Sequence, residues 1–415
     1  MAEKLFDTEE RQERIILVGV ETAEGDDTKQ SLEELEELGQ TAGAVTVGMV
    51  IQKRERMHPG TYIGKGKIEE VAALVSQCNA DTVVCDDELS PAQLRNLSDA
   101  LDVKVIDRTV MILDIFAKHA TTNEGKLQVE LAQLRYRSSH LIGERTELSR
   151  LGGGIGTRGP GEQKLEQDRR LIRNRISQLK KELEQVTRTR TLTRKKRQEN
   201  PIPVIAIVGY TNAGKSTLLN YLTGAGVLSQ DKLFATLDPT ARKCTLPSGL
   251  QVILVDTVGF VSRLPHDLVD AFKSTLEEAA CSDIILKIAD ASDSEAAEQL
   301  SVTDEVLNDL GCGDIPQVTV YNKCDRTGVA PYDPDVLLVS AKTGYGLDSL
   351  LAKIDEILAH RVRTIEVLLP YDKLALADVF RTRGSVLAEE YRENGVYYKA
   401  TVKVDDLHRF EAYLL

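Results

Sequence analysis

The 415-residue sequence lacks the features that place a chain in or across a membrane. No apolar run approaches the roughly 18 residues that a membrane-spanning helix needs. The first residues, MAEKLFDTEERQER, are acidic and lack the apolar core of a secretory signal peptide. Six cysteines are present, but none form a CxxC pair or show zinc-finger spacing. We therefore expect a cytoplasmic protein with reduced thiols and no membrane segment. We also expect it to be a monomer.

Charge is distributed unevenly along the chain. The whole sequence carries −13, whereas residues 143–197 contain 16 Lys and Arg against 7 Asp and Glu, which is +9 and leaves −22 on the rest. A solvated helix face is the ordinary explanation of a charged segment. The run RTRTLTRKKR, however, has six basic residues and no acidic one. This run favours a polyanion-facing arm on an acidic body.

Residues 1–110 alternate Val- and Ile-rich runs with segments of helical spacing. This alternation predicts a small α/β domain around a largely parallel sheet, with strands at 14–20, 44–51, 81–87 and 103–107. A glycine-lysine turn, YIGKGKIEE, could hold a phosphate at the helix N-terminus. Because this motif is short and unspecific, a plain tight turn is the preferred interpretation.

Residues 111–200 contain two apolar stripes on either side of a glycine-rich loop. Apolar positions follow 4-3-4-3 spacing from 127 to 141 and again from 172 to 186, which places them along one face of each helix. We expect an antiparallel helical hairpin whose second helix, 162–186, is about 37 Å long. The alternative, a loose linker between two domains, leaves this spacing unexplained.

The loop itself, LGGGIGTRGPG, contains six glycines in eleven residues. Gly154, Gly156 and Gly159 match the spacing of the dinucleotide-binding fingerprint, which requires a preceding strand and a following helix in a βαβ unit. The preceding segment, SSHLIGERTELSRL, is charged and helix-like. We therefore reject a dinucleotide site and expect the loop at the tip of the hairpin.

The most specific motif is VIAIVGYTNAGKSTLLNYL, in which a β-run leads into a glycine-rich loop and then an amphipathic helix. This context identifies a P-loop, whose backbone N–H groups surround phosphate oxygens. We expect Lys215 to reach the β and γ phosphates and the Ser216 hydroxyl to ligate Mg²⁺. The predicted nucleotide-binding residues of this loop are Gly209, Tyr210, Thr211, Asn212, Ala213, Gly214, Lys215, Ser216 and Thr217.

Three further motifs follow in the order that a GTPase requires. In VILVDTVGF, Asp256 can hold Mg²⁺ through a water and the Gly259 N–H can sense the γ-phosphate. In NKCD, Asp325 can accept two hydrogen bonds from guanine, a donor pair that adenine lacks, so the site prefers GTP. The SAK backbone can complete the base pocket. The predicted residues of these motifs are Asp256, Thr257, Val258, Gly259, Asn322, Lys323, Asp325, Ser340, Ala341 and Lys342.

The residue after DTVG is Phe260. Ras-like proteins have a glutamine there that orients the attacking water. A phenylalanine side chain can neither donate nor accept a hydrogen bond. We therefore expect slow intrinsic hydrolysis unless another group or a partner positions the water.

A metabolic P-loop kinase is disfavoured because it needs neither NKxD nor SAK.

The expected fold class is α/β, in four parts. The segment ENPIPV marks a boundary near residue 200. Asn394-Gly395 lies between two strand-like runs and predicts a hairpin. We expect an N-terminal α/β subdomain at 1–110, the helical hairpin at 111–200, a GTPase domain at 201–363 and a small α+β C-terminal domain at 364–415.

Seven motifs together resemble the HflX family of ribosome-associated GTPases, within the Obg-HflX branch. They are EGKLQVELAQL, RLGGGIGTRGPGE, GYTNAGKSTLLN, FATLDPT, DTVGF, NKCD and SAKTG. The resemblance implies a protein that binds the large ribosomal subunit and splits stalled or idle ribosomes, with GTP favouring the bound state. It also implies that the hairpin loop reaches the peptidyl-transferase region of the ribosomal RNA. The alternative function is a GTP-switched assembly factor or RNA chaperone that never separates the subunits.

The resemblance also assigns roles to individual residues. It identifies FATLDPT as switch I and Thr236 as the second Mg²⁺ ligand, which makes Lys215, Thr236 and Gly259 the expected catalytic residues. Switch I adds Phe234, Ala235, Thr236, Leu237 and Asp238 to the nucleotide site. The expected RNA contacts are Gly153, Gly154, Gly156, Arg158, Arg169, Arg170 and Arg173.

Overall fold

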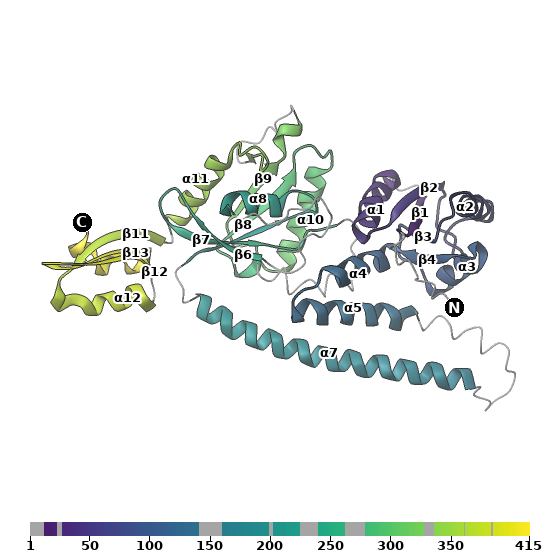
Figure 1. Ribbon diagram of the computed structural model, residues 1–415, viewed down its shortest axis with the longest axis horizontal. Coiled ribbons are helices and arrows are strands. Elements are labelled where there is room, and N and C mark those ends of the chain that lie inside the picture. The colour runs from purple at the N-terminus through teal and green to yellow at the C-terminus, as the bar shows by residue number, and fades with distance from the viewer. Residues whose placement is uncertain are drawn as a thin grey trace, which may run out of the picture. The chain divides into compact units, whose positions relative to one another are not determined.

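The computed structural model describes residues 12–22, 27–140, 160–198, 202–224, 240–261, 279–327, 336–360, 362–382 and 385–415 (Figure 1). The expected tip residues Gly153, Gly154, Gly156 and Arg158 lie outside these ranges, as do the switch I residues 234–238. Within the described residues the chain forms a four-stranded, a six-stranded and a three-stranded sheet. It divides into two compact units, the first of which extends to Lys181.

The four-stranded sheet belongs to the first unit and is entirely parallel, as expected, in the order β2-β1-β3-β4. Its strands are β1 (Arg14–Glu21), β2 (Val45–Lys53), β3 (Thr82–Cys85) and β4 (Lys104–Asp107). Its helices are α1 (Thr28–Ala42), α2 (Lys65–Cys78), α3 (Pro91–Leu101) and α4 (Arg108–His119). Every residue from Ile15 to Val20 is buried, as is typical of a parallel strand with both faces covered.

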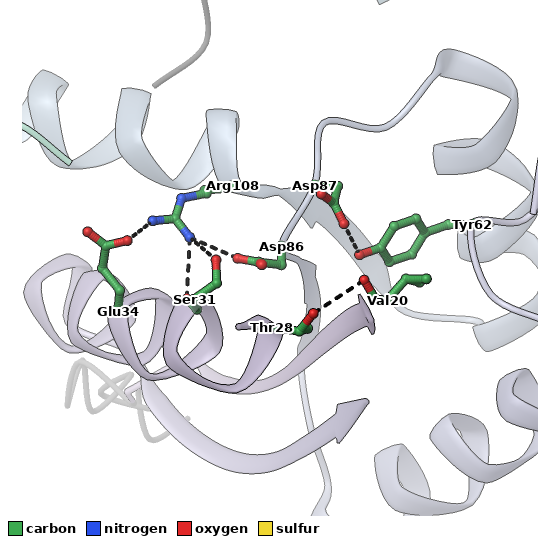
Figure 2. A network of polar contacts seen from close by, with 8 residues as sticks. All are labelled: Val20, Thr28, Ser31, Glu34, Tyr62, Asp86, Asp87 and Arg108. Carbon is green, nitrogen blue, oxygen red and sulfur yellow. Dashed lines mark hydrogen bonds and ion pairs between the residues drawn. The ribbon is translucent and has the colours of Figure 1, made fainter. Parts of the chain in front are cut away.

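A buried ion pair joins three elements of this unit (Figure 2). Arg108, the first residue of α4, is 2% exposed, and its guanidinium donates to Asp86 Oδ1 at 2.8 Å. The same side chain contacts Ser31 Oγ at 3.1 Å and the Glu34 carboxylate, both on α1. Because a cation at a helix N-terminus opposes the helix dipole, these acidic partners are needed to hold it there. Arg108 thereby fixes α4 and α1 to the end of β3.

The helical hairpin is confirmed, and its second helix is longer than expected. It consists of α5 (Asn123–His140) and α7 (Pro160–Gln198). The part of α7 up to Lys181, which belongs to the first unit, lies side by side with α5 and antiparallel to it (Figure 1). Arg175 of α7 donates twice to the Glu130 carboxylate of α5, at 2.7 and 2.8 Å, and this hydrogen bonding lowers the pKa of Glu130. Leu179 is fully buried, as the stripe predicts.

The predicted end of the second helix at residue 186 is wrong, because α7 continues to Gln198 and is about 58 Å long. The basic run RTRTLTRKKR is therefore part of the helix. Arg, Lys and Gln are good helix formers, and they outweigh the threonines in this stretch.

The six-stranded sheet has the order β10-β9-β8-β5-β7-β6, in which every neighbouring pair is parallel except β6–β7. Its strands are β5 (Val204–Gly209), β6 (Thr240–Thr245), β7 (Gln251–Asp256), β8 (Ile284–Asp290), β9 (Gln317–Asn322) and β10 (Leu337–Leu338). Its helices are α8 (Lys215–Thr223), α10 (Ala296–Asp309) and α11 (Leu347–Leu358). Since β7 and β8 lie on opposite sides of β5, the carboxyl end of β5 is where a doubly wound sheet opens a crevice.

The third sheet is small and antiparallel, in the order β11-β13-β12. It consists of β11 (Val362–Leu369), β12 (Ser385–Arg392) and β13 (Gly395–Lys403), accompanied by α12 (Ala377–Thr382) and short 3₁₀ turns. The hairpin predicted at Asn394-Gly395 is present, but Gly395 begins β13 rather than lying in the turn. Its φ is +149°, and a Cβ there would lie 2.3 Å from the Leu369 carbonyl oxygen, so only glycine fits.

In the described part of the chain no helix is long and apolar enough to cross a membrane. All six cysteines lie in described segments, and each is a free thiol.

Replacing Arg108 with alanine should destabilise the first unit by about 3 kcal/mol, because it removes the cation that faces a fully buried Asp86 carboxylate. Hydrogen exchange of the β1 and β3 amides measures this loss locally. Lys29→Ala, which breaks the exposed Lys29–Glu33 pair, is the control and should cost less than about 0.5 kcal/mol. Equal losses in the two variants would contradict the role given to Arg108.

Candidate functional site

The four sequence motifs of residues 204–342 meet at one edge of the six-stranded sheet. The P-loop follows β5, DTVG follows β7, NKCD follows β9 and SAK follows β10. Because these strands are parallel, their carboxyl ends lie at the same edge. Motifs that are far apart in the sequence therefore lie together and form a single site.

Two glycines allow the P-loop backbone to come close to its neighbours. Gly209 has φ +148°, and a Cβ there would lie 2.1 Å from the Ile288 carbonyl oxygen. Gly214 has φ +91°, and a Cβ there would lie 2.2 Å from Asn322 Nδ2. A side chain at either position would clash with the sheet and strain the backbone. The loop is thus pressed onto the ends of β8 and β9.

Lys215 lies inside the loop with only 6% of its surface exposed. Its ammonium donates to the carbonyl oxygens of Gly209 at 3.0 Å and Tyr210 at 2.6 Å. Burial lowers the pKa of Lys215 to about 8, although the nearby charge of Asp256 raises it. A cation that is this poorly solvated gains strongly from an anion placed beside it.

Ser216 and Asp256 bring two oxygen donors together beside Lys215. Ser216 Oγ donates to Asp256 Oδ2 at 2.7 Å, and Asp256 is 1% exposed. The next residue, Thr257, is fully buried and its hydroxyl donates to the Ile207 carbonyl at 2.7 Å, which fixes the start of the DTVG segment against β5. A Cβ on Gly259 would lie 2.8 Å from Lys215 Nζ, so this segment also packs directly on the P-loop.

Phe260 is buried rather than turned toward the phosphate end of the site. Its side chain is 3% exposed and belongs to a cluster with Val208, Tyr210 and Leu307. Its backbone is joined to the P-loop, since its N–H donates to the Gly209 carbonyl and its carbonyl accepts from the Thr211 N–H. The residue that replaces a water-orienting glutamine therefore serves as a core anchor for the segment that carries it.

Asn322 connects three of the four motifs. Its Nδ2 donates to the P-loop carbonyl of Ala213 at 2.9 Å, and its Oδ1 accepts from the N–H of Ala341 in SAK at 2.9 Å. Asn322 itself is 1% exposed. The first residue of NKCD thus holds the phosphate side and the base side of the site at a fixed separation.

Asp325 is held by a buried serine while its carboxylate faces solvent. Ser340 Oγ donates to Asp325 Oδ1 at 2.7 Å, and Ser340 is fully buried. This hydrogen bond lowers the pKa of Asp325, so the carboxylate is ionised and able to accept further hydrogen bonds at neutral pH. Lys342, the last residue of SAK, is exposed.

One residue of the site was missed by sequence reasoning. Asp290, the last residue of β8, forms an ion pair with Lys323 of NKCD, with 2.7 Å between Oδ2 and Nζ. The signal was present in the sequence, because IILKIAD is an apolar run that ends in aspartate, just as VILVD ends in Asp256. A run that ends in aspartate is no motif by itself, and Lys323, the partner of Asp290, is distant in sequence and meets it only through strand register.

The remaining predicted residues have varied positions. Thr217 is half-buried on α8, and Val258 is buried. On α7, Arg170 and Arg173 are exposed, whereas Arg169 is half-buried. The predicted residues of switch I and of the glycine loop lie outside the described part of the chain.

A P-loop followed by DxxG, NKxD and SAK at the edge of one parallel sheet defines a P-loop GTPase. The chain matches three protein families in succession. Residues 29–117 match "GTP-binding GTPase N-terminal", residues 119–197 match "GTP-binding GTPase Middle Region", and residues 204–323 match "50S ribosome-binding GTPase".

Similarity to known proteins extends over nearly the whole chain. GTPase HflX of Lacrimispora saccharolytica is 56% identical over 404 residues, which is 96% of each chain. GTPase HflX of Escherichia coli is 40% identical over 401 residues, covering 94% of this chain and 93% of the relative. The chain belongs to the GTPase HflX family and is a GTPase. A solved structure of SsGBP in complex with GDP is 27% identical and covers 84% of this chain and 99% of its own, with a TM-score of 0.50.

Asn322→Ala should destabilise the six-stranded sheet by about 2 kcal/mol, because it leaves the buried carbonyl of Ala213 and the N–H of Ala341 without this partner. Hydrogen exchange of the β9 amides measures the loss. Gln317→Ala at the other end of β9 is the control, since among the described residues the Gln317 side chain forms one long hydrogen bond, of 3.5 Å, to the Cys312 carbonyl. A loss no larger than that of the control would contradict the linking role of Asn322.

Proposed function

We propose that this GTPase binds the large ribosomal subunit in the cytoplasm and splits stalled or idle ribosomes, with GTP favouring the bound state and GDP following hydrolysis. The observation that carries the proposal is the combination, in one chain, of the P-loop, DTVG, NKCD and SAK motifs gathered at one sheet edge and a long basic helix that follows the glycine-rich segment in the sequence. The match of residues 204–323 to a family of 50S ribosome-binding GTPases supports it.

The phosphate end of the site binds the nucleotide chain through the P-loop. Backbone N–H groups of Asn212 to Thr217 and the N-terminus of α8 attract phosphate oxygens. The Lys215 ammonium exchanges its two carbonyl partners for phosphate, which compensates its burial. Gly259 lies beside Lys215, and its N–H donates a hydrogen bond to the γ-phosphate when GTP is bound.

Magnesium fits the donor set found here. Mg²⁺ takes hard oxygen ligands, and the Ser216 hydroxyl and the Asp256 carboxylate supply two, one of them through a water. Thr236, which the family resemblance assigns to the same ion, completes the protein ligands. When bound, the ion neutralises charge that develops on the β and γ phosphates.

The base end selects guanine. The Asp325 carboxylate accepts hydrogen bonds from N1–H and the 2-amino group, and the buried Ser340 hydroxyl keeps that carboxylate oriented before the nucleotide arrives. The backbone of Ser340 to Lys342 closes the pocket. ATP offers no such donor pair, so its affinity is low.

Hydrolysis depends on contact with the ribosome. Phe260 is buried in a core cluster, so its side chain has no part in orienting the attacking water. We propose that contact with the large subunit positions a group that orients the attacking water, and that this raises the rate of GTP hydrolysis.

The hairpin makes the RNA contacts. We propose that Gly153, Gly154, Gly156 and Arg158, which lie outside the described residues, approach the ribosomal RNA closely, since bare backbone fits a narrow cavity. Arg170 and Arg173 are exposed on α7 and free to meet phosphate along its length, whereas Arg169 is half-buried and contributes less. Phosphate contacts of this kind make binding strongly salt-dependent.

Asp325→Asn should weaken GDP binding by about a hundredfold, because one acceptor oxygen is replaced by an amide donor facing the donors of guanine. Xanthosine diphosphate, which presents an acceptor in place of the 2-amino group, should bind the variant better than GDP does. Equilibrium titration with both nucleotides tests this. An unchanged preference for GDP in the variant would remove Asp325 from the base pocket.

A variant with alanine at Gly153, Gly154 and Gly156 tests the ribosomal function. It should bind GTP like the wild type, because the P-loop is built on the six-stranded sheet by another part of the chain. It should, however, fail to convert 70S ribosomes to subunits in sucrose gradients run with a non-hydrolysable GTP analogue. Ribosome-stimulated hydrolysis should fall with it.

The wild-type gradients decide between the two candidate functions. Wild-type chain that sediments with large subunits but never splits ribosomes would favour the assembly factor. A triple variant that is fully folded and splits ribosomes at the wild-type rate would reduce the loop to a linker.

A further inference from the structure

The segment that follows β8 contacts the nucleotide site at a point that no motif marks. Asp290 stands opposite Asn322 in the parallel β8–β9 register, and the next residue, Ala291, donates to the Asn322 carbonyl at 2.8 Å. The Asp290 carboxylate is therefore beside the turn that leads into Lys323. The resulting ion pair is well shielded, since the side chains of Lys323 and Asp290 are 15% and 17% exposed.

Lys323 has an unusual backbone conformation, with φ +60°. Non-glycine residues in this left-handed region are uncommon, and a lysine there needs a reason. In this conformation Nζ lies 2.7 Å from Asp290 Oδ2 and 3.5 Å from Oδ1 of Asn212, a P-loop residue whose φ is also +60°. The lysine side chain thus extends from the end of β9 to a point between β8 and the P-loop.

Asp290 is itself fixed from its other side. Ser292 donates to Asp290 Oδ1 through both its N–H, at 2.9 Å, and its hydroxyl, at 2.6 Å. Partial burial raises the pKa of Asp290, but the bonds from Lys323 and Ser292 outweigh burial and hold this pKa below its ordinary value. One carboxylate oxygen is therefore used for anchoring, and the other faces the lysine.

We propose that Asp290 is a positioning residue for the bound guanine nucleotide, acting through Lys323. By holding the ammonium end, Asp290 keeps the four-carbon stem of Lys323 extended beside Asp325, where it forms a ready-made wall of the base pocket. A free lysine has several rotatable bonds to order on binding, and a lysine that is already ordered does not lose that entropy when the base arrives. The inference rests on the proposed nucleotide site and adds a residue to it.

The rate at which a fluorescent GDP derivative (mant-GDP) dissociates tests this role. Asp290→Ala should release mant-GDP about tenfold faster than wild type in a stopped-flow chase with excess GDP. Asp290→Asn, which keeps the shape and loses the charge, should release it about threefold faster and serves where the alanine variant folds poorly. Because this rate is measured only on chains that hold nucleotide, a smaller folded fraction does not change it.

Two further variants separate positioning from general support of the sheet. Lys323→Met should release mant-GDP faster by itself, and adding Asp290→Ala to it should change the rate by less than twofold, because the residue through which Asp290 acts is gone. Asp293→Asn is the matched control: it lies in the same segment and accepts from the Glu295 N–H and Gln299 Nε2. It should dissociate like wild type.

The outcomes distinguish this inference from the function beneath it. Wild-type dissociation from Asp290→Ala, or an equal acceleration by Asp290→Ala with Lys323 present and absent, overturns the positioning role alone. A wild-type chain that binds no mant-GDP overturns the proposed nucleotide site and this inference together.

Discussion

The site depends on how closely the P-loop backbone approaches the ends of β8 and β9. Gly209 lies against the Ile288 carbonyl and Gly214 against the Asn322 amide, at distances that leave no room for a Cβ. This contact fixes the direction in which the chain leaves β5 and begins α8. The positions of the buried Lys215 and of the Ser216–Asp256 pair, which adjoin the loop, depend on this contact.

Polar side chains then connect the loop to the base side of the site. Asn322 bonds the P-loop and SAK, Ser340 holds Asp325, and Asp290 holds Lys323. Each bond joins groups that come from different strand ends, so each one opposes a different displacement. Because both partners of each bond belong to the chain itself, these bonds reduce the free energy that nucleotide binding would otherwise spend on ordering the base side of the site.

Some parts of the fold and of the site could be predicted from the sequence, and others could not. The parallel first sheet, the hairpin and the P-loop between β5 and α8 followed from periodicity and motif context, because these depend on local patterns. The end of α7 did not, because the apolar stripe stops at residue 186 whereas Arg and Lys, which are good helix formers, continue the helix to Gln198. The position of Gly395 also did not, because its conformation is set by the Leu369 carbonyl on another strand. Asp290 was missed for the same physical reason: its partner Lys323 is distant in sequence and meets it only through strand register.

Phe260 shows how burial limits what the site can do by itself. Its ring packs with Val208, Tyr210 and Leu307, and its backbone is bonded to the P-loop at Gly209 and Thr211. Turning the ring out of that cluster would expose a large apolar side chain at a cost of about 2–3 kcal/mol and would still supply no hydrogen-bonding atom. The residue that orients water in Ras-like proteins is thus replaced here by one that stabilises the core. For fast hydrolysis, the water-orienting group has to come from elsewhere in the chain or from a bound partner. Slow intrinsic hydrolysis would leave bound GTP intact until such a partner is met, which is the behaviour that the proposed action on the ribosome requires.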